Sequence, residues 1–189
     1  MRTARGLSAL LAALTGLALL VAGPIMVARG FDGQHQVKNQ LTAQKIVFPQ
    51  TAKEGLPANL AGYAGQQVRT GTQAKAYADM VETHVLEATK GQTYSQVSDA
   101  YRATNSTDPK LGALRQTAFM GESLRGSLMG AYQAWELTWL VIGLGALFIG
   151  TGLVTTFAGV ISLLTWRRNR IKVPHTPASL IEQPHPTQA

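Results

Sequence analysis

One stretch of this chain limits its fold more than any other: thirty residues without a formal charge, Leu137 to Trp166. Fifteen of the thirty are Leu, Ile, Val or Phe, and each favours insertion into a bilayer by about 0.3 to 0.6 kcal/mol. As a helix the stretch covers roughly 45 Å, more than the roughly 30 Å of a hydrocarbon core. A buried helix of a soluble protein is amphipathic or shorter. The stretch therefore predicts a transmembrane helix over 137–166.

A second uncharged block lies near the N-terminus, from Leu7 to Ala28. Two interpretations are open. A cleaved signal peptide is compatible with the small residues at Ala28 and Gly30 and with Pro24, which is expected to break a helix. An uncleaved first transmembrane helix is favoured, because the block exceeds the 7 to 15 apolar residues typical of a signal peptide.

Charges at the ends of the two blocks predict the topology. Arg2 and Arg5 precede the first block, and four cations follow the second, at Arg167, Arg168, Arg170 and Lys172. Because cations mark cytoplasmic ends, residues 1–6 and 167–189 are predicted to be cytoplasmic and 29–136 extracytoplasmic. The tail 167–189, with four prolines and few apolar residues, is predicted to be disordered. The expected location is the plasma membrane, with two passes.

The net charge of +7 does not indicate nucleic acid. Between Arg29 and Glu136 there are eleven cations and nine anions, too even a balance for a phosphate-binding surface. The chain has no cysteine, which excludes disulfides and thiolate metal sites. The expected partners are therefore the lipid bilayer and other membrane proteins, not nucleic acid.

The extracytoplasmic domain is predicted to be small and mostly helical. Helices are expected over Thr72–Lys90, capped by Thr72 and stopped by Gly91, and over Tyr94–Ala103. Lys45–Pro49 is expected to pair with Gln66–Thr70 in one short β-hairpin. The polar segment Phe31–Gln44 is expected to be an exposed extension, and 50–64 a loop.

A long helix is predicted to start at Pro109, capped by Asp108, and to run directly into the second transmembrane helix. Residues that are apolar or small, except for Arg125, recur at steps of three and four along it, and no proline interrupts them. These residues are Leu111, Leu114, Ala118, Gly121, Arg125, Leu128, Tyr132 and Trp135. The fold class is therefore mainly α.

Small residues recur at helical spacing within both apolar blocks. One row is Ser8, Ala12 and Gly16; others are Ala18 with Ala22, and Ala146 with Gly150. Gly143, Gly145, Gly152 and Gly159 lie in the second block as well. Small residues allow close approach of membrane helices, so these faces are expected to pair with each other or with a membrane-protein partner. The alternative is that they reflect composition alone.

No catalytic constellation is recognisable. His84 and Glu87 have the i, i+3 spacing of two groups on one helical face, but a metal site needs three or four ligands. Neither transmembrane segment contains an ionisable residue, as a proton or ion pathway would require. We therefore predict no enzyme activity, no metal and no cofactor. Possible ligand or partner contacts are His84, Glu87, Tyr77 and Tyr94.

The segment 74–94 resembles a family of small actinobacterial two-span membrane proteins of unknown function. The resemblance is carried by His84, Leu86, Glu87, Ala88, Gly91, Thr93 and Tyr94. Asp108-Pro109 and the segment 123–128 are also similar. Family members often carry the label aromatic ring-opening dioxygenase, which implies a mononuclear iron site. This chain does not supply two histidines and a carboxylate in one place, so the label is unsupported here.

Two functions are weighed. The first is a non-catalytic accessory or scaffold subunit on a larger membrane complex. The layout is also similar to accessory subunits of actinobacterial cytochrome bcc–aa3 respiratory supercomplexes, a resemblance that implies a respiratory complex. The alternative is a membrane-anchored extracytoplasmic sensor or small-ligand-binding module around His84.

Overall fold

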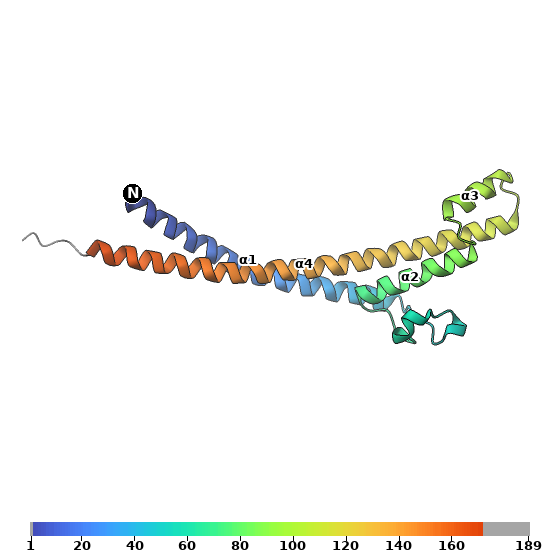
Figure 1. The fold of residues 1–189 in the computed structure, drawn as a ribbon, viewed down its shortest axis with the longest axis horizontal. Helices are drawn as coiled ribbons and strands as arrows, with labels where there is room; N and C mark the ends of the chain where they lie inside the picture. The colour runs from blue at the N-terminus through green and yellow to red at the C-terminus, as the bar shows by residue number, and fades with distance from the viewer. Residues whose placement is uncertain (1, 172–189) are drawn as a thin grey trace, which may run out of the picture. The chain divides into compact units, whose positions relative to one another are not determined.

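A computed structural model describes residues 2–171, with side chains from Gly6 to Arg168. The described chain is mainly helical, as predicted (Figure 1). Its α-helices are α1 (Arg2–Ala43), α2 (Gly71–Ala88), α3 (Tyr94–Ala103) and α4 (Pro109–Ile171), and its 3-10 helices are η1 (Ala52–Glu54) and η2 (Ala58–Tyr63). The tail predicted to be disordered over 167–189 begins later than expected, because residues 167–171 belong to α4; its remainder lies outside the described residues.

The chain forms two compact units, and the division falls within α1 and α4. One unit contains the chain up to Ala22 and from Leu147; the other is Gly23–Ala146. Residues 31–136 of the second unit are called the head below.

The long helix predicted from Pro109 is present. α4 begins at Pro109, where the Asp108 carboxylate accepts hydrogen bonds from the backbone N–H groups of Lys110 (2.8 Å) and Leu111 (3.2 Å). α4 is unbroken from there through the second apolar block to Ile171. The local cap and the uninterrupted pattern therefore sufficed to predict a helix of 63 residues.

α1 is longer than predicted. The segment 31–44, expected to be an exposed extension, continues the helix of the first apolar block as far as Ala43, and Pro24 lies inside the helix without ending it. The expectation failed because this segment has few apolar residues. Two of those it has, Val37 and Leu41, are one turn apart and pack into the head core, and such contacts stabilise a helix that composition alone does not predict.

The head core combines residues from four elements and the loops between them. It consists of Leu41, Phe48, Leu56, Leu60, Val68, Ala74, Ala78, Met80 and Leu128. Phe48 is 1% exposed, and its ring lies 5.1 Å from the rings of both Tyr63 and Tyr77. This aromatic cluster is the centre around which the segment between α1 and α2 folds.

The predicted β-hairpin is reduced to one antiparallel bridge, between Val47 and Gln67. The Phe48 N–H donates to the Gln66 carbonyl and the Val68 N–H to the Ile46 carbonyl, both at 2.9 Å. The described residues contain no strand. The pairing stops early because the N–H groups that would extend it donate elsewhere, Gln66 to the Tyr63 carbonyl at 2.9 Å and Gln50 to the Glu54 carboxylate at 2.8 Å.

α2 starts slightly earlier than predicted. Its cap is Thr70, not Thr72: the Thr70 side chain accepts from the Gln73 N–H, and the Gln73 side chain accepts from the Thr70 N–H. This reciprocal capping box satisfies two donors that would otherwise lack partners. α2 ends at Ala88, and Gly91, at φ 81°, donates back to the Leu86 carbonyl at 2.7 Å. α3 has the predicted bounds.

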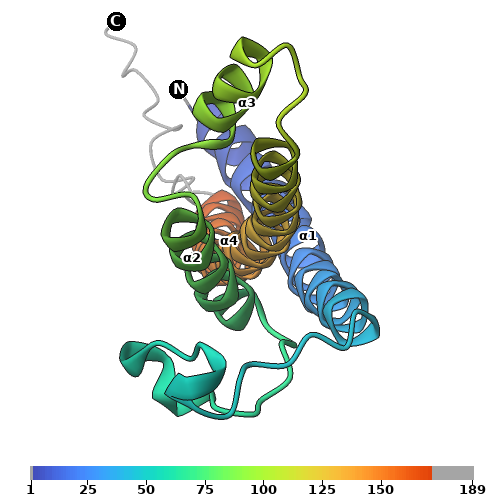
Figure 2. The same cartoon turned by 90° about the vertical axis from the view of Figure 1, so that its right-hand side faces the viewer.

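α2 and α3 both lie along the first part of α4 (Figure 2). The Arg115 guanidinium of α4 stands 4.6 Å from the centre of the Tyr101 ring of α3. A methyl group at Gly71, at the start of α2, would lie 2.4 Å from Trp135 Cβ of α4. α4 is thus the element on which the head is assembled.

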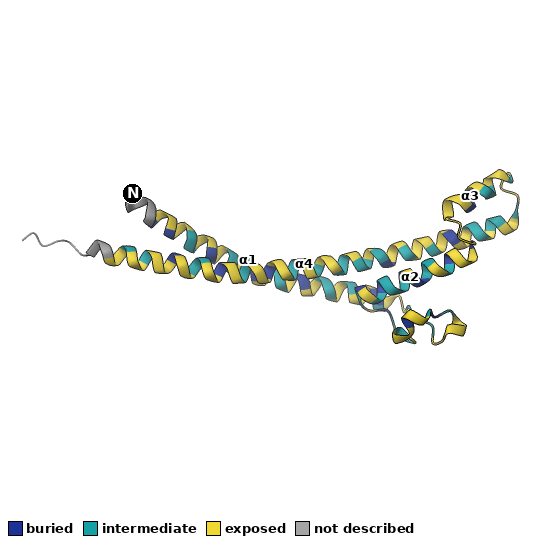
Figure 3. Ribbon diagram, in the orientation of Figure 1, coloured by how far each residue is buried: buried dark blue, intermediate teal, exposed yellow. Residues whose placement is uncertain are grey.

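Both long helices are apolar enough to cross a membrane. Their most apolar 18-residue windows have mean hydropathies of 2.3 for α1 and 2.1 for α4, and 11% of each window is buried. Most of each helix is therefore exposed (Figure 3). The predicted two transmembrane helices are confirmed to this extent.

Candidate functional site

His84 is held in place by the loop before α2. Its Nε2 lies 2.8 Å from the Gly55 carbonyl oxygen, so this nitrogen carries the proton and donates. Gly55 itself has a φ of 93° and ends η1, a conformation that favours glycine. His84 is half-buried, and its hydrogen bond ties α2 to the loop.

The other three predicted site residues do not converge on His84. The Tyr77 ring packs edge-on against Phe48 in the head core, and its burial raises the pKa of the Tyr77 phenol. Tyr94 is 39% exposed and lies 5.7 Å from the Phe119 ring. Glu87 is exposed. The spacing along α2 was read correctly, but these side chains serve separate contacts.

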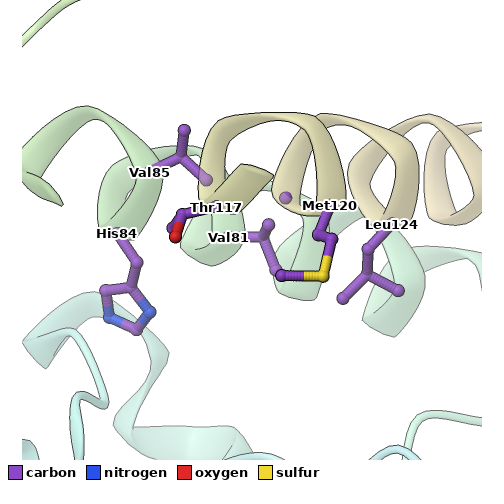
Figure 4. A pocket seen from close by; sticks show the side chains of 7 residues that line it. Val81, His84, Val85, Thr117, Met120 and Leu124 are labelled. Atoms are coloured by element: carbon purple, nitrogen blue, oxygen red, sulfur yellow. The ribbon is translucent and has the colours of Figure 1, made fainter. Parts of the chain in front are cut away.

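A groove does lie beside His84 (Figure 4). It has a volume of about 300 Å³ and is open to the surface. Its walls are Val81, His84 and Val85 from α2, and Thr117, Met120, Gly121 and Leu124 from α4. Since only His84 and Thr117 carry polar side-chain atoms, the groove is suited to apolar groups.

The floor of the groove is a close contact between α2 and α4. A methyl group at Gly121 would lie 2.2 Å from Val85 Cγ2, so only glycine permits this approach. An ion pair also joins the two helices: Arg125 of α4 lies 3.0 Å from Glu82 of α2 and 3.3 Å from Glu122. The two walls are therefore held at a defined separation without any occupant.

Nothing in the described residues assembles a metal site. No group of three His, Cys, Asp or Glu residues lies close enough to hold a metal ion among them. His84 has the Gly55 carbonyl, not a carboxylate, as its polar neighbour. The geometry around His84 is that of a packing and anchoring residue.

The apolar parts of α1 and α4 pack through glycines. In the unit that contains both termini, a methyl group at Gly152 would lie 2.9 Å from the Gly16 carbonyl oxygen. One at Gly159 would lie 2.6 Å from the Ala13 nitrogen. Ala13 contacts Gly159, and Gly16, further along α1, contacts Gly152, which is earlier in α4. The two helices therefore run antiparallel here, with their backbones in contact.

The larger unit contains the same kind of contact. A methyl group at Gly145 would lie 2.7 Å from the Gly23 carbonyl oxygen, and one at Gly30 would lie 2.4 Å from Ile142 Cγ1. A methyl group at Gly33 would lie 2.9 Å from Thr138 Cγ2. The direction is again antiparallel.

The glycines at these contacts follow a different spacing from the predicted small-residue rows. They are spaced by seven: Gly16, Gly23 and Gly30 on α1, and Gly145, Gly152 and Gly159 on α4. We call these the glycine rows. Between 137 and 168, the three α4 glycines are the only buried residues. Ala146 and Gly150 of the predicted row are exposed, and so is Ala18.

A seven-residue period was the sequence signal that the search for four-residue rows missed. Positions spaced by seven lie on one seam of a helix that supercoils with a partner. A four-residue step drifts away from that seam after one turn. Both helices carry three glycines at this period, so a search at seven identifies the contact surface of each.

Comparison with known proteins identifies no relative: no protein-family model, curated protein or solved structure matches the chain.

Proposed function

We propose that this protein is a non-catalytic integral membrane protein that docks on a larger membrane complex as an accessory or scaffold subunit. In this proposal α1 and α4 span the plasma membrane, both termini are cytoplasmic, and the head is extracytoplasmic. The observation that supports it best is the exposure of apolar side chains along both long helices.

The size of this apolar surface argues for a lipid environment. Leu14, Leu17 and Val21 of α1 are 55–58% exposed, and Val154 and Phe157 of α4 are 69% and 66% exposed. Burying one such side chain completely stabilises by about 1.5 to 3 kcal/mol. In water, each exposed apolar side chain along the two helices would forgo this stabilisation. In hydrocarbon, the same side chains are already out of water, so their exposure costs nothing.

Docking on a membrane partner is supported by the glycines that the α1–α4 contact leaves unused. At Gly143 and at Gly150, a methyl group would meet no atom within 4 Å. Such exposed glycines allow another membrane helix to approach closely. Neither apolar segment contains an ionisable residue, so the segments are suited to anchoring and contact and not to transport.

The alternative function, a sensor or small-ligand-binding module, has one observation in its favour, the groove beside His84. It draws less support from the structure because His84, Glu87, Tyr77 and Tyr94 do not line a common site. Replacement of both His84 and Glu87 by alanine should abolish ligand binding, and with it the protein's function, if the two residues form a ligand site. If the accessory function is correct, the same replacement should change the protein's function little.

The proposal is tested by purifying the tagged full chain in a mild detergent and identifying co-purifying proteins by mass spectrometry. A membrane protein recovered in near-equal amount is expected. The Gly143→Leu variant should lose this partner, because it adds bulk at an outward glycine. Thr151→Leu, at an exposed position that already has a side chain, is the control. Recovery of the wild-type chain as a lone monomer contradicts the proposal.

A further inference from the structure

The groove of the head lies on the path that α1 follows along α4. Within the larger unit, α1 meets Gly145 and Thr138 of α4 through Gly23 and Gly30. Nearer its end, Val37 and Leu41 belong to the cluster that also contains Leu128 and Ala131 of α4. α1 then ends at Ala43.

The α4 surface that receives α1 continues beyond this end. Gly145, Thr138 and Ala131 are spaced by seven, and the next two positions at this spacing are Leu124 and Thr117. Both line the groove. Positions spaced by seven lie on one seam of a supercoiled helix. The groove is therefore the continuation of the α1–α4 interface over two further turns of α4, with no helix covering it.

α2 supplies the second wall along these two turns. Val81 and Val85 face Gly121 across the contact already described, and they are one helical turn apart. Met120 and Leu124 of α4, which are 55% and 38% exposed, form the opposite edge. Two helices in contact along one side, with an apolar furrow between them, are the usual receptor for a third helix.

We propose that this groove binds an amphipathic helix of a partner protein, seated on α4 in line with the end of α1. The proposal rests on the accessory function proposed above and names the surface of the head that contributes to docking. The distance from Thr117 to Leu124 corresponds to about 10.5 Å of helix. The bound segment is therefore about two turns long, with aliphatic side chains at i, i+3 or i+4, and i+7.

Other occupants fit the groove less well. A lipid chain is disfavoured because the lining segment of α4 lies between the charged residues Arg115 and Arg125, outside the apolar span. A polar small molecule would find only His84 and Thr117 as polar side chains, and His84 already bonds to Gly55. The groove's shape and lining suit a row of aliphatic side chains.

The test uses the full chain in its native membrane, with the photoreactive residue benzoyl-phenylalanine at Thr117. Illumination is expected to give an adduct with another protein, and the attached peptide should map to an amphipathic helix. Met120→Lys should lower the adduct yield roughly tenfold or more, because it places a charge in the groove where an apolar side chain of the partner helix would be buried on binding. Met120 is exposed, so this variant is expected to fold.

Phe119→Lys is the matched control. Phe119 is adjacent to Met120 on α4 and 52% exposed, compared with 55%, but does not line the groove. It should leave the yield unchanged. An adduct with a second copy of this chain, with lipid or with a small molecule overturns the inference, and so does the absence of an adduct at Thr117.

A second probe separates failure of this inference from failure of the proposed function. Benzoyl-phenylalanine at Leu140, which is 57% exposed and one helical turn from Gly143, reports on the same side of α4 in the apolar span. An adduct at Leu140 without one at Thr117 overturns only the groove inference. The absence of protein adducts at both positions overturns both.

Discussion

The glycine rows and the head core bury different kinds of side chain, although α1 and α4 contribute to both. The glycine rows contribute no side-chain carbon, so the partner helix approaches their backbone directly, as at Gly152 and Gly16. The head core contains Phe48, Val68 and Leu41, each 5% exposed or less.

This difference follows from the solvent that each region is proposed to face. In water, packing large apolar side chains removes them from solvent and drives folding. In hydrocarbon there is no such gain, because lipid chains are as apolar as leucine, and helices associate through close van der Waals contact. The large apolar residues of the membrane segments accordingly point outward, and the glycines point inward.

Cleavage of the first apolar block would remove the glycine rows altogether, and it is the most severe test of this comparison. Gly30 is buried against Ile142 within a continuous α1, so we predict that the segment Ala28–Gly30 is not cut. The intact mass of the purified, C-terminally tagged chain should include the first apolar block. Ala28→Leu, which removes the small residue from that site, should differ from wild type only by the substitution. A mature chain that begins near residue 30 would contradict a packed α1.

Phe48→Ala should have the next largest effect, confined to the head. Phe48 is 1% exposed and contacts the rings of Tyr63 and Tyr77, so its truncation should destabilise the head by about 3 to 5 kcal/mol. Limited proteolysis of the segment between α1 and α2 measures this effect. Phe119→Ala, at an exposed ring, is the control and should be cut at nearly the wild-type rate. Equal resistance of the Phe48 variant would mean that the aromatic cluster does not hold the head together.

Gly152→Leu should have a smaller effect, confined to the helix pair. Its first side-chain carbon would lie 2.9 Å from the Gly16 carbonyl oxygen, and overpacking of this kind costs about 1 to 3 kcal/mol. Because the chain has no cysteine, spin labels attached at Leu10→Cys of α1 and Leu164→Cys of α4, both exposed positions, report on the separation of the two helices without background. The distance between the labels should increase in the Gly152→Leu variant.

Gly150→Leu provides the matched control for this experiment. A methyl group at Gly150 meets nothing within 4 Å, so the distance between the labels should remain at its original value. Equal label distances in the Gly150 and Gly152 variants would mean that the helices do not meet along the glycine rows.

The sequence predicted the elements whose signals are local. The start of α4 at Pro109 and the bounds of α3 were predicted correctly, because a cap, a proline or a glycine acts within one turn. The α4 residues that recur at steps of three and four also lie on a covered face: Ala118 and Leu128 are buried, and Leu111, Leu114 and Trp135 are half-buried. A helical period in the sequence predicts these positions without knowledge of what covers them.

The errors concern contacts between distant segments. The C-terminal part of α1 was taken for an extension because Val37 and Leu41 acquire their role only when the head core forms around them. The sequence likewise did not predict the neighbours of His84, Tyr77 and Tyr94, because Gly55, Phe48 and Phe119 lie elsewhere in the chain. The spacing of residues along one helix does not determine which distant residue each side chain contacts.

By itself, the sequence determined that the chain has two helices able to cross a membrane, because hydropathy and charge are properties of continuous segments. Tertiary structure alone decided which glycines make contact, where α1 ends and that a groove remains between α2 and α4. The physical reason is the same in each case. Burial depends on the surface that a second, distant segment presents, and Gly150 and Gly152 differ in nothing but the helix that one of them faces.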